Sequence, residues 1–352
     1  MPRREAEFTP EVITPINKLL IANRGEIAVR AARACQERGI TAVIPYSLED
    51  SQTLIARMAD EQEGWELAPI GGVSADESYA NPEKILDEAK FRGCDAIFLG
   101  YGFLSEDAAF IRHCQEAKIR VLAPPASVME LTGNKIRARE TAKKVKIGRL
   151  AHIPVLEGTG NLATFQDASR EAPQLTYPVM LKDPDTGGGM GNLVAHNREE
   201  LERPYQQLRL RPGNIEVFME RFIQNAAHIE VQIAADRYGN VVSLGERDCT
   251  MQRRHQKIVE ESPAPGISRH LREVIQTAAV NFARDINYQG VGTWEFIVDM
   301  DRKGQHDDPS WYFMEINPRI QVEYPVTEAQ TGVDIVNLMI DVAEGKRLRI
   351  SQ

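Results

Sequence analysis

The first third of the chain alternates short apolar runs with segments of helical periodicity. An apolar run at 18–22 leads into a turn at Gly25, and apolar or small residues then recur with a helical period over residues 27–38. A second apolar run follows Gly39. These segments predict a strand, a helix and a parallel strand, and the alternation continues to about residue 125. The pattern therefore predicts an open α/β domain on a parallel sheet.

The remainder of the chain has a different pattern. Residues 127–222 begin with helical periodicity and continue as a strand, a glycine-rich loop and a second strand. From about residue 223 the apolar positions alternate with a period of two, apart from one helical segment at 270–286. This mixture predicts an α+β second half.

Composition narrows the class of protein. A chain of 352 residues suggests two or three domains, and its first 15 residues, with charges of both signs, predict a flexible arm rather than a signal peptide. The formal net charge of −9 argues against duplex nucleic acid as a partner, because affinity for nucleic acid comes from neutralising phosphates. No run of about 18 apolar residues occurs, so no membrane span is expected. The four cysteines form no CxxC pair, which favours reduced thiols in a cytoplasmic protein over a zinc site.

Polar side chains alternate without a break from residue 315 to residue 323. In an extended chain every second side chain points to the same face, which directs Ile316, Ile320 and Val322 toward a core. Pro318 predicts that the segment leaves the sheet near that position. The opposite row suits a hard cation beside an anion, and plain solvent exposure is the alternative. This row consists of Glu315, Asn317, Arg319, Gln321 and Glu323.

Glu295 lies in an earlier strand-like segment. A turn-rich stretch at 302–310 separates it from Glu315, so a hairpin would bring the two carboxylates together. Two carboxylates and the amide oxygen of Asn317 suit Mg²⁺, which takes oxygen ligands. The sequence therefore predicts a magnesium site across this hairpin.

A second alternating row begins at His228 and is followed by six consecutive polar residues at 252–257. A basic run of this kind is usually a solvated surface. Two amides and an imidazole directly after apolar strands nevertheless suit an anion, and we interpret the run as an anion site. Its members are Gln252, Arg253, Arg254, His255, Gln256 and Lys257.

The glycine-rich loop contains Gly187, Gly188 and Gly189 between two predicted strands. It lacks the Gly-Lys-Ser/Thr ending of a P-loop and the following helix that a dinucleotide fingerprint requires. A loop of this kind can still fold over phosphates and donate backbone N–H groups, with a simple hairpin turn as the alternative.

At this point the residues resemble a known family. The segments IANRGEIAVR, GYGFLSE, HIEVQ, ERDCTMQRRHQK, EESPAPG, MEIN-x-RIQVE and VTE-x-x-TGVD are similar to the signatures of biotin carboxylases. Such proteins are subunits or domains of acetyl-CoA, propionyl-CoA, longer-chain acyl-CoA and pyruvate carboxylases. The resemblance runs from about residue 18 to the end of the sequence. It implies a biotin carboxylase N-terminal α/β domain over residues 16–125, and an ATP-grasp domain over 126–352 with a lid at about 150–222.

The resemblance also implies site residues, carried over position by position. The expected ATP contacts are the phosphate-binding Lys135 and Lys182, the glycine loop, the adenine hinge Glu220, Arg221 and Ile223, and the ribose and phosphate contacts His228, Gln252 and His255. The expected metal ligands are Glu295, Glu315 and Asn317, and the expected bicarbonate contacts are Lys257, Arg319, Gln321 and Val322. Glu323 matches the general base.

The implied reaction makes carboxybiotin from ATP, bicarbonate and biotin on a carrier, with Mg²⁺ or Mn²⁺. The implied partners are a biotin carboxyl carrier protein or domain and a carboxyltransferase, and the family also forms homodimers. Two alternatives remain at this stage. One is another ATP-grasp ligase, such as a carbamoyl-phosphate synthase-like enzyme, and the other is a non-catalytic partner that serves assembly or regulation.

The sequence departs from the family pattern in several places. The glycine loop carries Asp183, Asp185 and Met190 where the family has neutral small residues and a cation, which predicts weak ATP binding that reversion would tighten. Two other motifs also differ, since Phe98-Leu99 replaces His-Pro and Tyr324 replaces His. The family pattern also continues beyond residue 352, so we expect a truncated C-terminal part.

Overall fold

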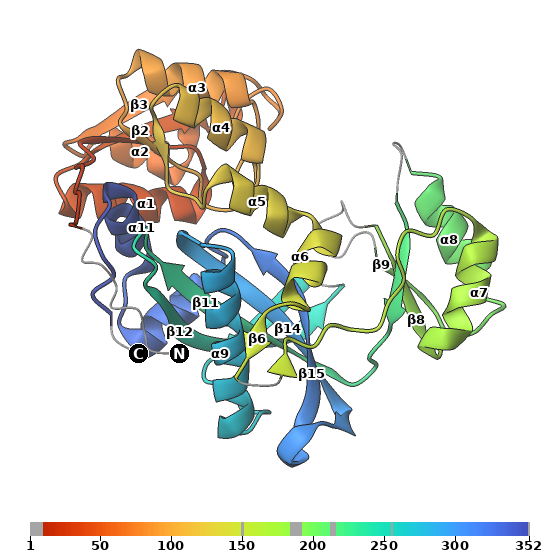
Figure 1. Ribbon diagram of the computed structural model, residues 1–352. Coiled ribbons are helices and arrows are strands. Elements are labelled where there is room, and N and C mark those ends of the chain that lie inside the picture. Colours follow the sequence, from red (N-terminus) through yellow and green to blue (C-terminus); the bar gives the residue numbers. More distant parts are fainter. Residues whose placement is uncertain (1–9, 149–150, 184–191, 212–215, 255, 351–352) are drawn as a thin grey trace.

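A five-stranded parallel sheet forms the N-terminal part of the molecule (Figure 1). The computed structural model describes residues 10–148, 151–183, 192–211, 216–254 and 256–350. The strand order β3-β2-β1-β4-β5 confirms the predicted open α/β arrangement. The strands are β1 (Lys18–Ile21), β2 (Thr41–Tyr46), β3 (Trp65–Pro69), β4 (Ala96–Phe98) and β5 (Arg120–Val121). The helices are α1 (Gly25–Glu37), η1 (Glu49–Gln52), α2 (Leu54–Ala59), α3 (Pro82–Phe91) and α4 (Ala108–Glu116).

Both faces of this sheet are covered, because apolar residues of its strands point to both sides. Leu19 and Ile21 belong to a core that includes the buried face of α1, whereas Leu20 packs with the buried residues of α3 and α4. The strand order reverses between β1 and β4, and loops at such a reversal form a crevice beyond the carboxyl ends of the strands. The Asn23 amide ties these loops together, since it donates to Leu99 O at 2.7 Å and to Tyr101 O at 2.8 Å.

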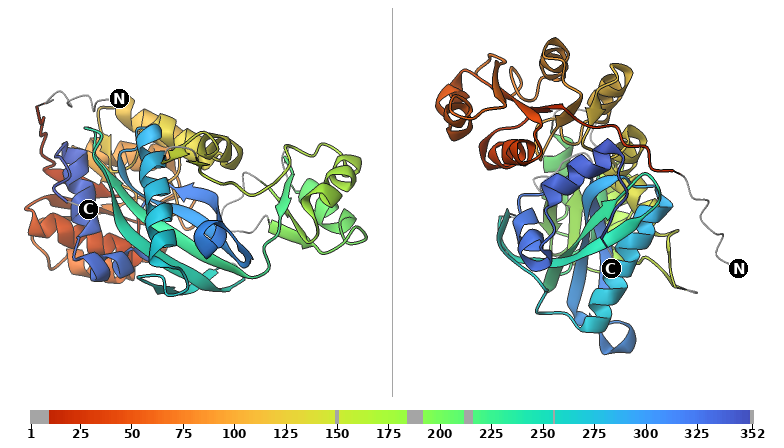
Figure 2. Two further views of the ribbon diagram at one scale, coloured as in Figure 1. Left: turned by 60° about the horizontal axis from the view of Figure 1, so that its bottom comes forward. Right: turned by 90° about the vertical axis from the view of Figure 1, so that its left-hand side faces the viewer.

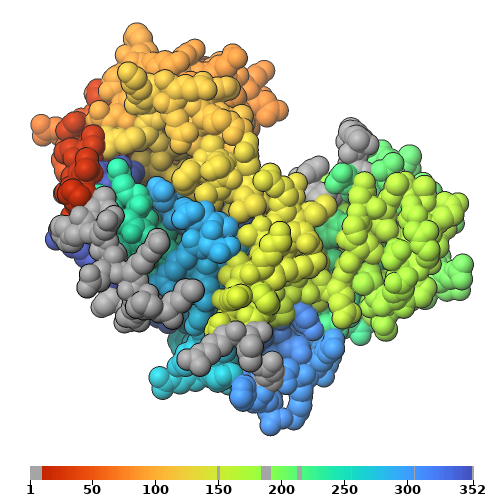
Figure 3. Space-filling model, viewed as in Figure 1, coloured from red at the N-terminus to blue at the C-terminus, as the bar shows by residue number. Residues whose placement is uncertain are grey.

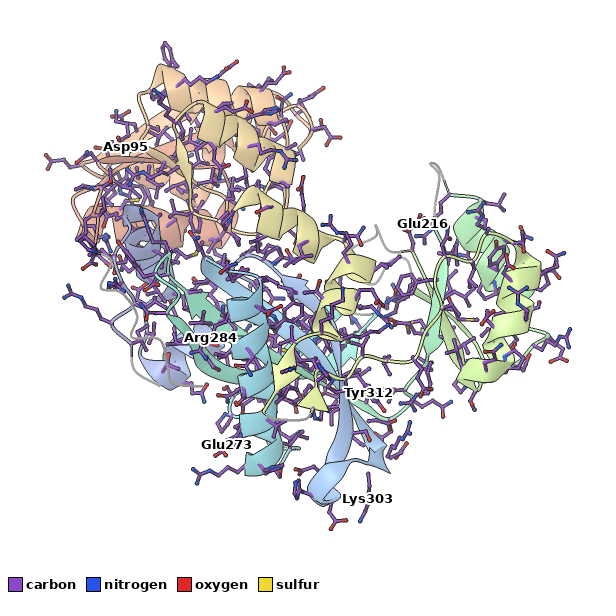
Figure 4. All side chains as sticks on the ribbon, viewed as in Figure 1. Asp95, Glu216, Glu273, Arg284, Lys303 and Tyr312 are labelled. Carbon is purple, nitrogen blue, oxygen red and sulfur yellow. The ribbon has the colours of Figure 1, made fainter. Side chains whose placement is uncertain are left out.

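The chain before β1 is held against the body. The Thr14 N–H donates to Glu344 O at 2.8 Å, and the Val12 N–H donates to the Tyr238 hydroxyl at 2.9 Å. Asp95, labelled in Figure 4, accepts hydrogen bonds from the backbone N–H groups that enter β1. The predicted flexible arm is therefore wrong for residues 12–15, and residues 1–9 lie outside the described part.

A small layered unit projects from the body on the right of Figure 1. Its antiparallel sheet has the order β10-β8-β9, and α7 and α8 pack on it through Ala168, Leu175 and Leu208. We call this unit the lid. The connection to it contains α5 (Ala126–Gly133), α6 (Lys135–Ala142), β6 (Lys146–Ile147) and β7 (Ala151–His152). The lid contains α7 (Phe165–Leu175), β8 (Val179–Lys182), β9 (Asn192–Ala195), α8 (Glu202–Arg209) and β10 (Phe218–Arg221).

A second five-stranded sheet, antiparallel throughout, carries the rest of the chain, with the order β13-β12-β11-β14-β15. Helix α9 lies along one face of it (Figure 2), and Ile275 and Phe282 of that helix pack against Trp294. This sheet confirms the predicted α+β second half. Its elements are β11 (Ala226–Ala235), β12 (Val241–Arg253), β13 (Gln256–Glu261), α9 (Arg269–Asp285), β14 (Gly290–Lys303), η2 (Gln305–Asp307), β15 (Pro309–Asn317), α10 (Tyr324–Thr331) and α11 (Ile335–Glu344). No helix within the described ranges is long and apolar enough to span a bilayer.

Candidate active site

A cavity of about 470 Å³ lies where the N-terminal loops, α6, the lid and the second sheet meet. The space-filling view shows the surface hollowed between the N-terminal part and the lid (Figure 3). Thirteen of the site residues implied by the resemblance line this cavity, as does Gln256 of the polar run, so the two polar rows converge as expected. The thirteen are Lys135, Lys182, Glu220, His228, Gln252, Lys257, Glu295, Glu315, Asn317, Arg319, Gln321, Val322 and Glu323.

The remaining predicted residues are placed differently. Arg221 and Ile223 line an adjoining cavity of about 220 Å³. The Arg221 guanidinium lies 3.1 Å from Asp299 and 3.2 Å from the hydroxyl of Tyr312, which is labelled in Figure 4. These contacts hold the Arg221 side chain against the sheet. Only the backbone of the hinge then remains to contact an adenine ring. His255 and Gly187, Gly188 and Gly189 lie outside the described residues.

Three cations gather at the lid end of the cavity. Lys182 Nζ lies 2.5 Å from Glu220 Oε2, and the Arg139 guanidinium pairs with the same carboxylate. Lys135 Nζ lies 3.4 Å from Glu315 Oε2. Burial and the nearby Arg139 charge lower the pKa of Lys182, while the contact with Glu220 stabilises its charged form. The three cations of this cluster face only two carboxylates, Glu220 and Glu315, so a polyanion entering here would balance the excess positive charge.

The predicted hairpin places Glu295 directly opposite Glu315 in the register of β14 and β15. The Asn317 amide donates to Glu295 Oε1 at 2.8 Å, and His228 Nε2 lies 3.2 Å from Glu295 Oε2. Burial alone would raise the pKa of Glu295, but Lys257 and His228 hold it well below the usual range. The two carboxylates therefore lie across from one another, each with a lysine as its cationic partner.

Lys257 joins three carboxylates at the opposite end of the cavity. Its ammonium lies 2.5 Å from Glu230 Oε2 and 3.2 Å from Glu295 Oε1, and it also donates to Glu323. Burial alone would lower the pKa of Lys257, but these carboxylates raise it above its ordinary value. Burial and the charge of Glu230 raise the pKa of Glu323, which is 5% exposed. A raised pKa makes this carboxylate a stronger base than an ordinary glutamate.

The segment after β15 differs from the predicted extended row. The strand ends at Asn317, as Pro318 predicted, and the following residues are irregular. Ile316 and Ile320 are buried, but Val322 is 58% exposed, so its predicted core position is wrong. Arg319 donates from Nε to Glu106 Oε1 at 2.5 Å and lies 3.3 Å from Asn317 Oδ1. The side chains of this row point into the cavity because the chain bends after Asn317, and not because a regular strand continues.

The departures from the family pattern are mostly buried. Phe98, Leu99 and Tyr324 are at most 3% exposed and belong to hydrophobic cores. Asp183 is 4% exposed, and its carboxylate lies 3.7 Å from Arg211 Nη1. It follows Lys182 at the end of β8, where consecutive side chains point to opposite faces. The expectation that Asp183 faces the phosphates is therefore wrong, while Asp185 and Met190 lie outside the described residues.

Asp183→Ala should leave ATP affinity unchanged to within about twofold, because the carboxylate faces Arg211 rather than the amine of Lys182. The variant should instead lower the thermal stability of the lid, since Arg211 loses a carboxylate partner. Calorimetric titration with Mg-ATP checks the first expectation. Tightening by about tenfold would restore the electrostatic explanation that the sequence suggested.

Several residues of the site were missed from the sequence. Tyr101, Gly102 and Arg139 line the cavity, and Glu230, which does not line it, forms an ion pair with Lys257. Glu230 stands two positions after His228, so the second alternating row already placed it on the same face, but it received no role in the site. Tyr101 and Gly102 belong to the GYGFLSE segment, which carried the resemblance without an assigned role. Arg247, the partner of Glu230 on β12, likewise belongs to the ERDCTMQRRHQK segment, which carried the resemblance without assigning it a role.

Comparisons with known proteins agree with this arrangement. The family model "Biotin carboxylase, N-terminal domain" matches residues 15–129, and "Carbamoyl-phosphate synthase L chain, ATP binding domain" matches residues 135–351. Biotin carboxylase 1 of Bacillus subtilis is 43% identical over 342 residues, which cover 96% of this chain and 72% of that protein. The Nostoc biotin carboxylase is 42% identical over 341 residues, with the same two coverages.

Solved structures give the same result. The Campylobacter jejuni biotin carboxylase, solved as a complex with a nucleotide described as β,γ-ATP, superposes with a TM-score of 0.87 at 40% identity, covering 95% of this chain and 72% of that chain. The biotin carboxylase domain dimer of Hydrogenobacter thermophilus 2-oxoglutarate carboxylase, solved with MgADP, ADP and bicarbonate, superposes at 0.86 with 41% identity, covering 96% and 72%. With family models, relatives and fold in agreement, the chain belongs to the biotin carboxylase family.

Proposed function

We propose that this chain carries out the first half-reaction of a biotin-dependent carboxylase, the ATP-dependent carboxylation of carrier-bound biotin with bicarbonate. One observation supports this most directly. A single cavity has phosphate-binding cations at the lid end and the Lys257, Arg319, Gln321 and Glu323 cluster at the other. Residues 16–125 would act as the N-terminal domain and 126–352 as the ATP-grasp domain, with the lid at about 150–222.

ATP would bind between the lid and the second sheet. Lys135, Lys182 and Arg139 would neutralise phosphate oxygens. Lys182 and Arg139 already pair with Glu220, and Lys135 with Glu315. The hinge at Glu220 to Ile223 would contact the adenine, and His228, Gln252 and His255 the ribose and phosphates. Gly187, Gly188 and Gly189 would cover the phosphates and keep water out.

The donor set at the β14–β15 hairpin fits a magnesium or manganese ion. Glu295, Glu315 and the Asn317 amide oxygen are hard oxygen ligands on neighbouring strands, which is the ligand chemistry that Mg²⁺ takes. Lys257 and Lys135 stand beside these carboxylates in the present structure. When bound, the ion would neutralise the negative charge that develops as the γ-phosphoryl group moves.

Glu295→Gln and Glu315→Gln should each raise the Mg²⁺ concentration for half-maximal turnover by at least about tenfold, because each removes one anionic ligand. Glu216→Gln, at an exposed position of the lid, is the control. The test is a Mg²⁺ titration at fixed ATP. An unchanged half-saturation for both variants would exclude the hairpin as the metal site.

Bicarbonate would bind against Arg319, Gln321, Lys257 and the backbone at Val322. A guanidinium binds such a planar anion through two parallel hydrogen bonds. Glu323 would take the bicarbonate proton, so that a carbonate oxygen attacks the γ-phosphorus and the bond to ADP breaks. The carboxyphosphate formed then yields phosphate and CO₂, which the deprotonated ureido nitrogen of biotin captures.

The partners would follow from this chemistry. Biotin would arrive on a carrier protein or domain, and a carboxyltransferase would consume the carboxybiotin. The dimer named for the Hydrogenobacter structure supports a homodimer here. We also propose a cytoplasmic location.

Transfer of label from ¹⁴C-bicarbonate to free biotin tests the proposal. Acid-labile label on biotin should form only with ATP and Mg²⁺ both present. Label that forms without ATP, or none with all reactants, would refute it.

A further inference from the structure

Arg247 is fully buried in β12 and does not line the cavity. Its guanidinium has five N–H groups, and each has an acceptor in the structure. Nε donates to Glu230 at 2.6 Å. Nη1 donates to Gln232 at 3.0 Å and to Thr327 at 2.6 Å. Nη2 donates to Thr293 and to Gln321, each at 3.4 Å. One side chain thus links three strands, the bend after β15 and helix α10.

The contact with Gln321 fixes the direction of an amide that lines the cavity. Gln321 Oε1 accepts from Arg247, and Gln321 Nε2 donates to Glu295 Oε1 at 3.1 Å. Amide oxygen and nitrogen are difficult to tell apart by shape, but the partners decide this case. A guanidinium can only donate and an ionised carboxylate can only accept, so the oxygen must face Arg247 and the nitrogen Glu295.

Without Arg247, only the contact with Glu295 would fix the direction of the amide. The reversed orientation would present an acceptor oxygen on the cavity side, next to the Glu295 carboxylate. An anion entering the cavity would then meet an oxygen in place of N–H donors. The direction of the amide therefore determines whether Gln321 attracts or repels an anion.

We propose that Arg247 is a positioning residue for bicarbonate, which it serves by holding the Gln321 amide with its N–H groups toward the cavity. The proposal deepens the function argued above and rests on it for the identity of the anion. Two further contacts support it. Arg247 shares Glu230 with Lys257, and it anchors Thr327, four residues after Glu323. Arg247 therefore supports three groups that are proposed to contact bicarbonate. It contacts Gln321 directly, Lys257 through Glu230, and Glu323 through helix α10.

Arg247→Lys is the informative substitution because it keeps the buried positive charge. An ammonium has three N–H groups and no fork, so it will stay with the Glu230 carboxylate and leave the Gln321 oxygen without its donor. The KM for bicarbonate should rise about tenfold, while the KM for ATP changes by less than about twofold. Steady-state kinetics with each substrate varied in turn measures both.

Arg272→Lys is the matched control. Arg272 pairs with Glu246, which is 1% exposed and immediately precedes Arg247, but neither residue lines the cavity. This variant disturbs a neighbouring, partly buried ion pair and should leave both KM values unchanged. In a Gln321→Met background, Arg247→Lys should no longer raise the KM for bicarbonate. A rise of equal size in both backgrounds would overturn the proposal.

A measurement independent of turnover separates this inference from the proposed function. In ¹⁵N–¹H spectra, the side-chain amide signals of Gln321 are identified by their loss in Gln321→Met. They should be dispersed and protected from exchange in the wild type and in Arg272→Lys, but not in Arg247→Lys. Unchanged signals in Arg247→Lys would overturn the positioning role even in an active enzyme. If the wild type shows no bicarbonate-dependent turnover, the proposed function fails, and the spectra still decide what Arg247 does.

Discussion

Glu323→Gln should lower bicarbonate-dependent turnover by roughly 10²–10⁴-fold, the usual contribution of a general base. Glutamine keeps the size of the side chain and an oxygen that can accept from Lys257, but it cannot take a proton. ATP affinity should change little, because Lys135 and Lys182 lie at the other end of the cavity. Initial rates of ADP formation, with and without bicarbonate, measure the effect.

The pH dependence sharpens this expectation. Burial and Glu230 raise the pKa of Glu323, so the carboxylate form is lost at a higher pH than in an ordinary glutamate. Turnover should therefore fall as pH decreases through that raised pKa, and Glu323→Gln should abolish this acidic limb. Glu328→Gln is the control, since Glu328 is an acid nearby that accepts from the Ile335 N–H at 2.7 Å. Equal rates in wild type and Glu323→Gln would remove Glu323 from the role.

Lys257→Met should both inactivate and destabilise the protein. Lys257 is the shared cation of Glu230, Glu295 and Glu323, each at most 5% exposed. Removing one partner of a buried ion pair typically costs about 3–5 kcal/mol, because the remaining charge stays uncompensated. We expect a loss of that size in the free energy of unfolding, measured by urea denaturation at pH 8.

This loss should shrink at lower pH. Lys257 lowers the pKa of all three carboxylates, so without it they take up protons at a higher pH in the folded protein, and part of the lost stability is recovered in acid. Lys143→Met provides the comparison, since Lys143 is half exposed beside Glu140 and its loss should cost less than about 1 kcal/mol. A pH-independent loss, or one no larger than in Lys143→Met, would contradict the central place of Lys257.

Much of the site could be predicted because it lies on strands. The period-two rule grouped Glu315 with Asn317, the turn-rich stretch predicted the hairpin to Glu295, and the register of β14 with β15 agrees with both. The same rule failed at Val322, because the chain bends after Pro318 and no longer alternates. Alternation is informative only as far as the backbone remains extended.

Contacts between distant segments could not be predicted in this way. The acceptors of Arg247 come from residues 15 to 80 positions away, and Arg211 meets Asp183 from beyond another helix. The rigid attachment of residues 12–15 likewise depends on Glu344 and Tyr238. Such contacts depend on how separate elements pack, which local patterns do not encode.

The buried position of Asp183 also bears on the non-catalytic alternative. That alternative relied in part on negative charge beside the ATP phosphates, and Asp183 is directed to Arg211 instead. Lys257, Arg319 and Glu323, which a non-catalytic partner would not need, line one cavity. The geometry therefore favours an enzyme.

The most direct test of this account is the rate of ADP formation by the purified chain with Mg-ATP, measured with and without bicarbonate and with and without free biotin. We predict that ADP formation requires bicarbonate, rises further with biotin and is nearly absent in Glu323→Gln. ATP hydrolysis that is indifferent to bicarbonate, or the absence of hydrolysis despite ATP binding, would contradict the assignment of this cavity as a biotin carboxylase active site.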